Sequence, residues 1–331
     1  MSPPASSARR HRVSVAEPAG DEELCLIGAT RLQDFVDFVR QRAKGGGRRQ
    51  TGELADTWRS ASRIYQDLQS AEAGVADAVP VRALPASVQT YVNEVAKLPH
   101  FQRTFSSVPV AFGMVELDRL VVCQQQLTLS AVKTLLARHP RKPGARALAG
   151  ICLPGQEPPM NFEVVRRHGD EFVFRSDNHD ARVLGRRVLT GASMPDLDLP
   201  GHAQAVVCLA VGFSSNVINV IRYGKRLVLS NGYHRAYALR SMGVTHVPCV
   251  IQVCEHWEDV GLAVGGEMYH NGEPYFSWTR PPLLRDFFDD RLVHRIATSP
   301  VHRHIRVTLT TDSDLWRTNG DIQSETLQRN V

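Results

Sequence analysis

Apolar residues recur at helical spacing through the first third of the chain. In segments 31–42, 54–68 and 87–98 they fall three or four positions apart, which places them on one face of an amphipathic helix. Three such helices predict a helical subdomain over residues 21–104. Residues 1–20 are rich in Ser, Pro and Arg and lack this periodicity, so we expect a disordered tail there.

From residue 108 onward the pattern changes to short runs in which apolar and polar residues alternate. This period of two is typical of half-buried strands. Together with the helices, it predicts an α+β fold, in which a mixed-sheet domain over 105–255 follows the helical subdomain. A β-rich insertion is predicted within this domain at about 138–204. Its alternating runs are residues 162–166, 171–175 and 182–189.

The remaining segment, 256–331, is expected to be a C-terminal extension. Two prolines begin a stretch at 282–295 that contains Phe287 and Phe288 among three aspartates, and we interpret it as a helix that docks through its aromatic residues. An alternating run at 303–310 predicts a strand after this helix.

One strand–turn–helix–strand unit points to a binding site. An apolar run at 226–229 leads into a turn at Gly232, a helical segment to Met242 and an apolar strand at 247–253. Glycine allows a positive φ or a close approach of a ligand to the backbone. The N-terminus of the following helix offers unpaired N–H groups and a positive dipole end, and Arg235 adds a bidentate donor. These features predict a phosphate-binding turn.

Segment 213–253, read together with 115–124, resembles the ParB/sulfiredoxin superfamily. That family has a central strand and hairpin, a Gly-x-His-Arg turn, a short helix and a Val-Pro strand; here the turn is Gly232, His234 and Arg235. The resemblance implies a cytoplasmic nucleotide-binding protein that takes ATP or another nucleotide, with Mg²⁺, and a small-molecule substrate.

Two departures from the family pattern bear on the function. Tyr233 stands where sulfiredoxins carry the catalytic cysteine, so reduction of a sulfinic acid is not expected. The family also contains a free-serine kinase branch without that cysteine, which implies ATP-dependent phosphoryl transfer to a small molecule. The alternatives are a nucleotide-gated DNA-binding regulator and a nuclease. No helix-turn-helix pattern follows Cys254, so a nucleic acid is the less favoured partner, and the choice between enzyme and regulator stays open.

Three residues are candidates for catalysis. Glu116 and Asp118 share one face of the expected opening strand, where a carboxylate could bind Mg²⁺ or activate a hydroxyl nucleophile; the alternative is a solvated strand face. His234 changes charge near neutral pH and is a candidate general acid or base, or a residue that only orders the turn. The residues expected to contact the nucleotide are Gln124, Ser214, Ser215, Asn216, Asn231, Gly232, Tyr233, His234 and Arg235.

Two further polar clusters favour structural interpretations over metal sites. Residues 177–180 are Asp-Asn-His-Asp, but such runs usually form turns. His302 and His304 alternate on one strand and are interpreted as a basic edge. We therefore assign no metal ligand. The sequence also contains no Walker A loop, nucleophile elbow, H-E-x-x-H motif or dinucleotide fingerprint.

Composition and charge narrow the range of partners. A formal net charge of +5 and a pI near 9.0 suit an anionic ligand. No apolar run approaches the roughly 18 residues that a membrane span needs, and no apolar leader begins the chain, so we expect a cytoplasmic protein without a membrane partner. The six cysteines show no C-x-x-C spacing and are expected to be buried free thiols. The pattern specifies no oligomeric state.

Overall fold

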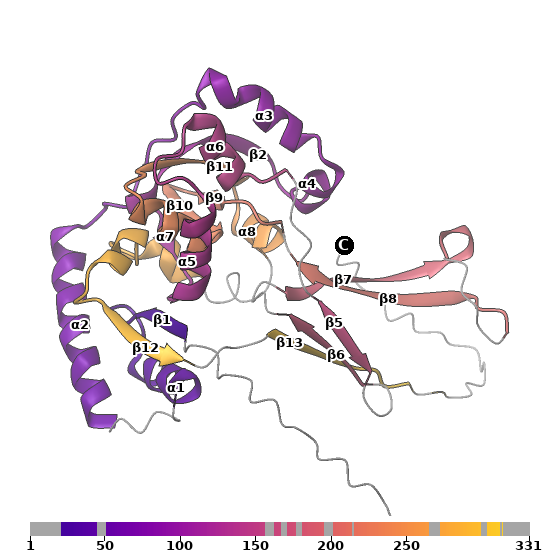
Figure 1. The fold of residues 1–331 in the computed structure, drawn as a ribbon, viewed down its shortest axis with the longest axis horizontal. Helices are drawn as coiled ribbons and strands as arrows, with labels where there is room; N and C mark the ends of the chain where they lie inside the picture. The colour runs from indigo at the N-terminus through magenta and orange to yellow at the C-terminus, as the bar shows by residue number, and fades with distance from the viewer. Residues whose placement is uncertain are drawn as a thin grey trace, which may run out of the picture. The chain divides into compact units, whose positions relative to one another are not determined.

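The computed structural model divides the chain into two compact units (Figure 1). The structure describes residues 21–44, 51–155, 162–166, 171–176, 181–194, 201–213, 215–264, 272–298, 303–311 and 313. The first unit comprises residues 1–159 with 213–301, and the second comprises 160–212 with 302–331. The second unit therefore begins later than the insertion expected at about 138–204, and it includes the end of the expected C-terminal extension.

A five-stranded mixed sheet lies at the centre of the first unit, and the α+β class is confirmed. The strand order is β2-β11-β9-β10-β3; β11 is antiparallel to β2 and parallel to β9, and β10 is antiparallel to β9. The strands are β2 (Val110–Glu116), β3 (Val121–Val122), β9 (Asn219–Tyr223), β10 (Arg226–Asn231) and β11 (His246–Cys254). The central strands are apolar in succession rather than alternating, because both of their faces are covered.

Helices cover the two faces of this sheet. On one face Val220 and Leu229 join the main core, and on the other Ile221 and Cys254 pack against Val260. The helices of the first face are α3 (Ala86–Ala96), α4 (Pro99–Thr104), α5 (Leu129–Arg138), α6 (Ala145–Cys152) and α7 (Tyr233–Ser241). The helices of the second face are α8 (Trp257–Val264) and α10 (Glu273–Ser277).

The segment expected as a helical subdomain at 21–104 also contains a strand, β1 (Asp21–Leu26). This strand is central in a second sheet of order β12-β1-β4, with partners from two distant parts of the chain. Its apolar residues are consecutive because both faces are buried, so they show neither the helical nor the alternating period. The other strands are β4 (Gln126–Thr128) and β12 (Val293–Thr298). The helices α1 (Leu32–Arg42) and α2 (Thr51–Ala71) form where the pattern predicted them.

The prediction of a helix at 282–295 is wrong. The segment forms a short 3-10 helix, η3 (Leu284–Phe288), and then enters β12. The second half of the segment joins a sheet instead, because residues 293–298 pair with β1 and Leu292 is buried just before them. Asp286 holds the start of η3: its carboxylate accepts a hydrogen bond from the Leu283 N–H at 2.9 Å and is also paired with the buried Arg280.

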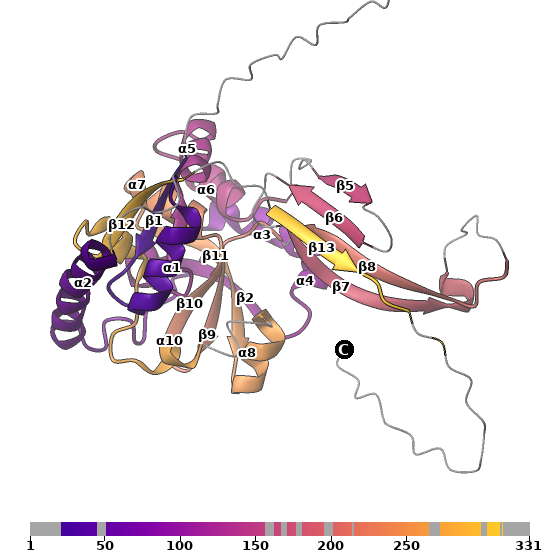
Figure 2. The same cartoon turned by 90° about the horizontal axis from the view of Figure 1, so that it is seen from below.

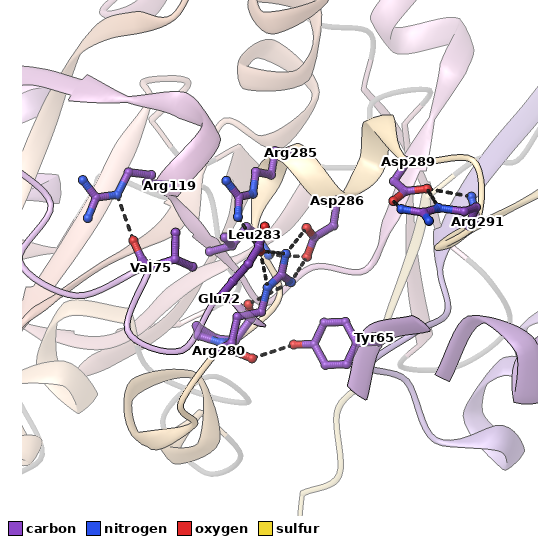
Figure 3. A network of polar contacts seen from close by, with 11 residues as sticks. Tyr65, Glu72, Val75, Arg119, Arg280, Leu283, Arg285, Asp286, Asp289 and Arg291 are labelled. Atoms are coloured by element: carbon purple, nitrogen blue, oxygen red, sulfur yellow. Dashed lines mark hydrogen bonds and ion pairs between the residues drawn. The ribbon is translucent and has the colours of Figure 1, made fainter. Parts of the chain in front are cut away.

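A buried ionic network ties η3 to α2 (Figure 3). Arg280 is 1% exposed and pairs with both Asp286 and Glu72, while the Tyr65 hydroxyl donates to the Arg280 carbonyl at 2.9 Å. Arg285 also pairs with Glu72. Burial alone would raise the pKa of Glu72, but the hydrogen bonds and charges of the two arginines outweigh it and lower that pKa. The network therefore holds ionised groups between two segments far apart in sequence.

The second unit contains only β structure among its described residues, apart from a 3-10 turn, η2 (Gly191–Ser193) (Figure 2). A three-stranded sheet has the order β13-β6-β5, and a separate two-stranded ribbon pairs β7 with β8. The alternating runs predicted four of these strands, and β8 is an apolar run instead. The strands are β5 (Glu163–Arg166), β6 (Glu171–Ser176), β7 (Ala181–Thr190), β8 (Ala205–Phe213) and β13 (Arg303–Thr308). Residues 177–180 and His302 lie outside the described residues.

Candidate functional site

Gly232 forms the turn between β10 and α7. Its φ of 93° and ψ of 22° lie in the left-handed region, which favours glycine. A Cβ at this position would also lie 3.0 Å from Ile218 Cγ1 and 3.1 Å from Ile218 Cα. The turn therefore needs glycine both for its backbone conformation and for its close approach to the segment before β9.

Two side chains hold this preceding segment against the turn. Asn231 accepts a hydrogen bond from the Gly232 N–H at 2.9 Å and donates from Nδ2 to the Ser215 carbonyl at 2.7 Å. Arg235 donates from Nη2 to Asn216 Oδ1 at 2.7 Å and from Nη1 to the Asn216 carbonyl. Five of the residues expected at the nucleotide site thus meet in one place. Ser214 lies outside the described residues.

Arg235 does not project into solvent; it is 7% exposed. Its two hydrogen bonds to Asn216 give the guanidinium a structural role. The charge of the guanidinium also affects the pKa of neighbouring groups. Burial is the main cause that lowers the pKa of His139, and the neighbouring charges of Arg235 and then Arg138 lower it further. Arg235 and Arg138 therefore place two positive charges near His139, beside the first turn of α7.

His234 and Tyr233 both connect the start of α7 to the segment that follows β3. His234 Nε2 accepts a hydrogen bond from the Thr128 N–H at 3.0 Å, so this nitrogen carries no proton in the structure. The Tyr233 hydroxyl donates to the Leu229 carbonyl and accepts from the Cys123 N–H at 3.4 Å. Burial raises the pKa of Tyr233 well above its ordinary value. Both side chains order the turn, which is the structural alternative considered for His234.

Gln124 lies beside the turn without pointing a free amide into it. Its backbone lies next to the hydroxyl of Tyr233, but its exposed side chain folds back, and Nε2 donates to the Gln126 carbonyl at 2.6 Å. Gln124 is therefore near the predicted site, with its side-chain nitrogen used locally.

The two candidate carboxylates lie at the opposite end of α7 from Gly232. Asp118 forms an ion pair with Arg240 in the last turn of the helix, at 2.5 Å. At the helical rise, Arg240 is roughly 11 Å along the axis from the first residue of α7. Glu116 ends β2 directly opposite His246, with which β11 begins after the helix. The structure therefore brings neither carboxylate to the turn, and Asp118 lies in a 3-10 helix, η1 (Leu117–Arg119), instead of the expected strand.

A buried amide pair beside the turn could not be predicted from the sequence. Asn219 lies opposite Asn231 across β9 and β10, and its Nδ2 donates to Gln252 Oε1 at 2.7 Å. The two residues are 5% and 1% exposed. Within the described part of the chain, Asn219 Oδ1 has no hydrogen-bond partner. Buried acceptors are nearly always satisfied, so this oxygen is suited to a donor from a ligand or from water.

The cysteines near the turn are protonated at neutral pH. Burial raises the pKa of Cys152 to about 12, although the charge of Arg235 opposes the shift, and burial raises the pKa of Cys123 further. All six cysteines are free thiols. Among the described residues, no group of three or more His, Cys, Asp or Glu side chains is arranged to hold a metal ion, and no helix has the length and apolar character to cross a bilayer.

Comparison with known proteins adds no relative: the chain matches no protein-family model, no curated protein and no solved structure. The resemblance to the ParB/sulfiredoxin superfamily therefore stays a prediction, as do the nucleotide and the substrate. The function has to follow from the geometry and charge of the Gly232 turn.

Proposed function

We propose that the chain is a nucleotide-binding protein of the ParB/sulfiredoxin type, which holds the phosphates of ATP or another nucleotide at the Gly232 turn. The observation that carries the proposal is the presence of two arginines at this place, the buried Arg235 on α7 and the exposed Arg138 next to His139. The pKa of His139 is lowered by burial and by Arg235 and Arg138, and an anion bound there would relieve this repulsion.

The geometry of the turn supports an anion in two further ways. The N-cap of α7 is a glycine and provides no side-chain cap, and the positive end of the helix dipole at this terminus favours an anion. Arg235 fixes Asn216 and adds its charge, which makes it a positioning residue. Arg138 is exposed at the C-terminus of α5, where its side chain has the freedom to contact a phosphate directly.

The positions of the carboxylates favour a nucleotide-gated binding protein over a phosphotransferase. Phosphoryl transfer requires charge neutralisation and in-line positioning at the phosphates. Glu116 and Asp118 lie at the other end of α7, so a Mg²⁺ ion at the turn would depend on the nucleotide's own phosphate oxygens. We expect Glu116→Gln to leave nucleotide affinity within a few-fold. The opposite outcome would favour a kinase: free serine would accelerate the release of ADP from Mg²⁺-ATP, and Glu116→Gln would abolish that acceleration.

A thermal-shift screen with ATP, ADP, CTP and GTP, with and without Mg²⁺, tests the proposal. A nucleotide present at 100 times its dissociation constant stabilises the folded state by about 2.7 kcal/mol, which is readily measured. Arg138→Gln should weaken binding by about tenfold, because it removes a charge-assisted hydrogen bond. The matched control is Arg63→Gln, which removes the same charge from an exposed position on α2. The proposal fails if no nucleotide stabilises the protein, or if both variants bind equally.

A further inference from the structure

The ribbon formed by β7 and β8 exposes apolar side chains on both of its faces. Leu184 and Val188 are 52% and 65% exposed, and Val207 on β8 is 74% exposed. A Cβ at Gly212 would lie 3.1 Å from Leu184 Cδ1, so these two residues share one face and Val207 lies on the other. An isolated two-stranded hairpin is only marginally stable in water. The ribbon is therefore a surface that a partner would stabilise.

The strand β8 carries neither charged residues nor proline, two of the features that normally prevent strand pairing. Edge strands are usually protected by charged residues, proline or a short length. β8 has nine residues, AVVCLAVGF, without a charged residue or a proline. The described residues place it at the edge of its sheet, with β7 as its hydrogen-bonded neighbour. Another strand of matching apolar character is therefore suited to pair with this edge around the middle of β8.

We propose that β8 pairs antiparallel with β8 of a second copy of this chain, so that two ribbons form one four-stranded sheet across a two-fold axis. An isologous contact of this kind needs a self-complementary edge, which an uncharged strand provides. With the axis at Leu209, the middle residue of the strand, Leu209 faces its own copy and Val207 faces Val211. These three positions share a face, so the apolar surface continues across the junction.

The arginines of the ribbon favour this arrangement over the other edge. β7 contains Arg182, Arg186 and Arg187 and no acidic residue, and two of these lie near its midpoint. Pairing β7 with its own copy would bring like charges together across the axis, which is destabilising. β7 also lies beside β13 of the same unit. Pairing through β8 keeps all the arginines on the outer strands, away from the axis.

A nucleic acid is the main rival occupant, because a two-stranded ribbon with arginines fits a major groove. It would contact the basic side of the ribbon and leave the uncharged β8 edge in water. The apolar β8 edge therefore favours a second copy. The contact is small for a protein interface, so we expect a dimer that dissociates on dilution at roughly micromolar concentration.

Sedimentation of the full chain tests the proposal, together with two matched lysine substitutions. Leu209→Lys places a charge at the centre of the β8 edge, whereas Val188→Lys places it on the outer strand at a more exposed position. We expect a concentration-dependent dimer for the unmodified chain and for Val188→Lys, and a monomer for Leu209→Lys. Circular dichroism should show that both variants keep the fold.

Disulfide trapping provides a second measurement that does not depend on a loss of function. In a Cys208→Ala background, Leu209→Cys should form a covalent dimer on oxidation, because facing residues of an antiparallel pair lie within disulfide range. Val188→Cys should not. A chain that stays monomeric up to about 100 µM, or a dimer that Leu209→Lys leaves intact, overturns the proposal. The proposal is also overturned if the chain is a monomer that binds DNA and loses this binding when Arg186 and Arg187 are substituted.

Discussion

Gly232 combines two requirements that another residue cannot meet together. Its backbone is left-handed, and a Cβ at this position would lie 3.0 Å from Ile218 Cγ1. The sequence predicted the turn correctly because glycine, the preceding apolar strand and the following helix are all local signals. Their local nature also explains why the lowered pKa of His139 was not predicted, because its proximity to Arg235 is a tertiary contact.

Gly232→Ala should destabilise the protein by about 2 kcal/mol or more. A positive φ costs an L-residue roughly 1–2 kcal/mol, and the new Cβ would in addition press on the Ile218 backbone. Gly224→Ala is the control, since Gly224 has a φ of 58° but open space around its Cα. Urea unfolding should show a smaller loss for the control. Equal losses would mean that the contact with Ile218 is unimportant.

The lowered pKa of His139 makes stability depend on pH. The folded state favours the neutral imidazole, so the unfolded chain binds more protons below its ordinary pKa of 6.5. The contribution is present above pH 6.5 and is lost as the pH falls from there towards the folded pKa. His139→Gln should flatten the fall in unfolding free energy between about pH 7.5 and pH 5.5. An identical pH slope in the variant would contradict the lowered pKa of His139.

At the scale of elements, the sequence predicted amphipathic helices well. It did not predict a strand that is covered on both faces or a segment that is held by buried ion pairs. α1, α2 and α3 each show a one-sided apolar face. β1 shows no period because both of its faces are covered, and η3 is fixed by Asp286 and Arg280. Glu116 and Asp118 were expected near Gly232 because they are on the opening strand, but the chain order does not reveal at which end of α7 that strand finishes.

Asp286→Asn should destabilise the fold by about 3 kcal/mol, because it leaves the buried Arg280 with only Glu72 as an ionic partner. Asp289→Asn breaks a pair with Arg291, whose side chain is 65% exposed, and should cost less than about 1 kcal/mol. Chemical denaturation of both variants gives the comparison. Similar losses would show that the network does not link α2 to η3 energetically.

At the scale of the whole molecule, the α+β class follows from the hydrophobic pattern, but the division into units does not. The second unit combines residues 160–212 with 302–331, and strand pairing between such distant segments leaves no local signal. The net charge of +5 suits an anionic ligand, and the arrangement around α7 gives part of that charge a definite position. The central claim is that this position binds the phosphates of a nucleotide.

Amide NMR of the isotope-labelled chain during a titration with inorganic phosphate, and then with the nucleotide that stabilises it most, tests that claim most directly. Phosphate at the N-terminus of α7 should shift the amide signals of residues 233–235 the most and raise the pKa of His139. The nucleotide should shift the same signals at lower concentration. Signals of residues 233–235 that do not move with either ligand, or changes confined to another part of the chain, would contradict the account.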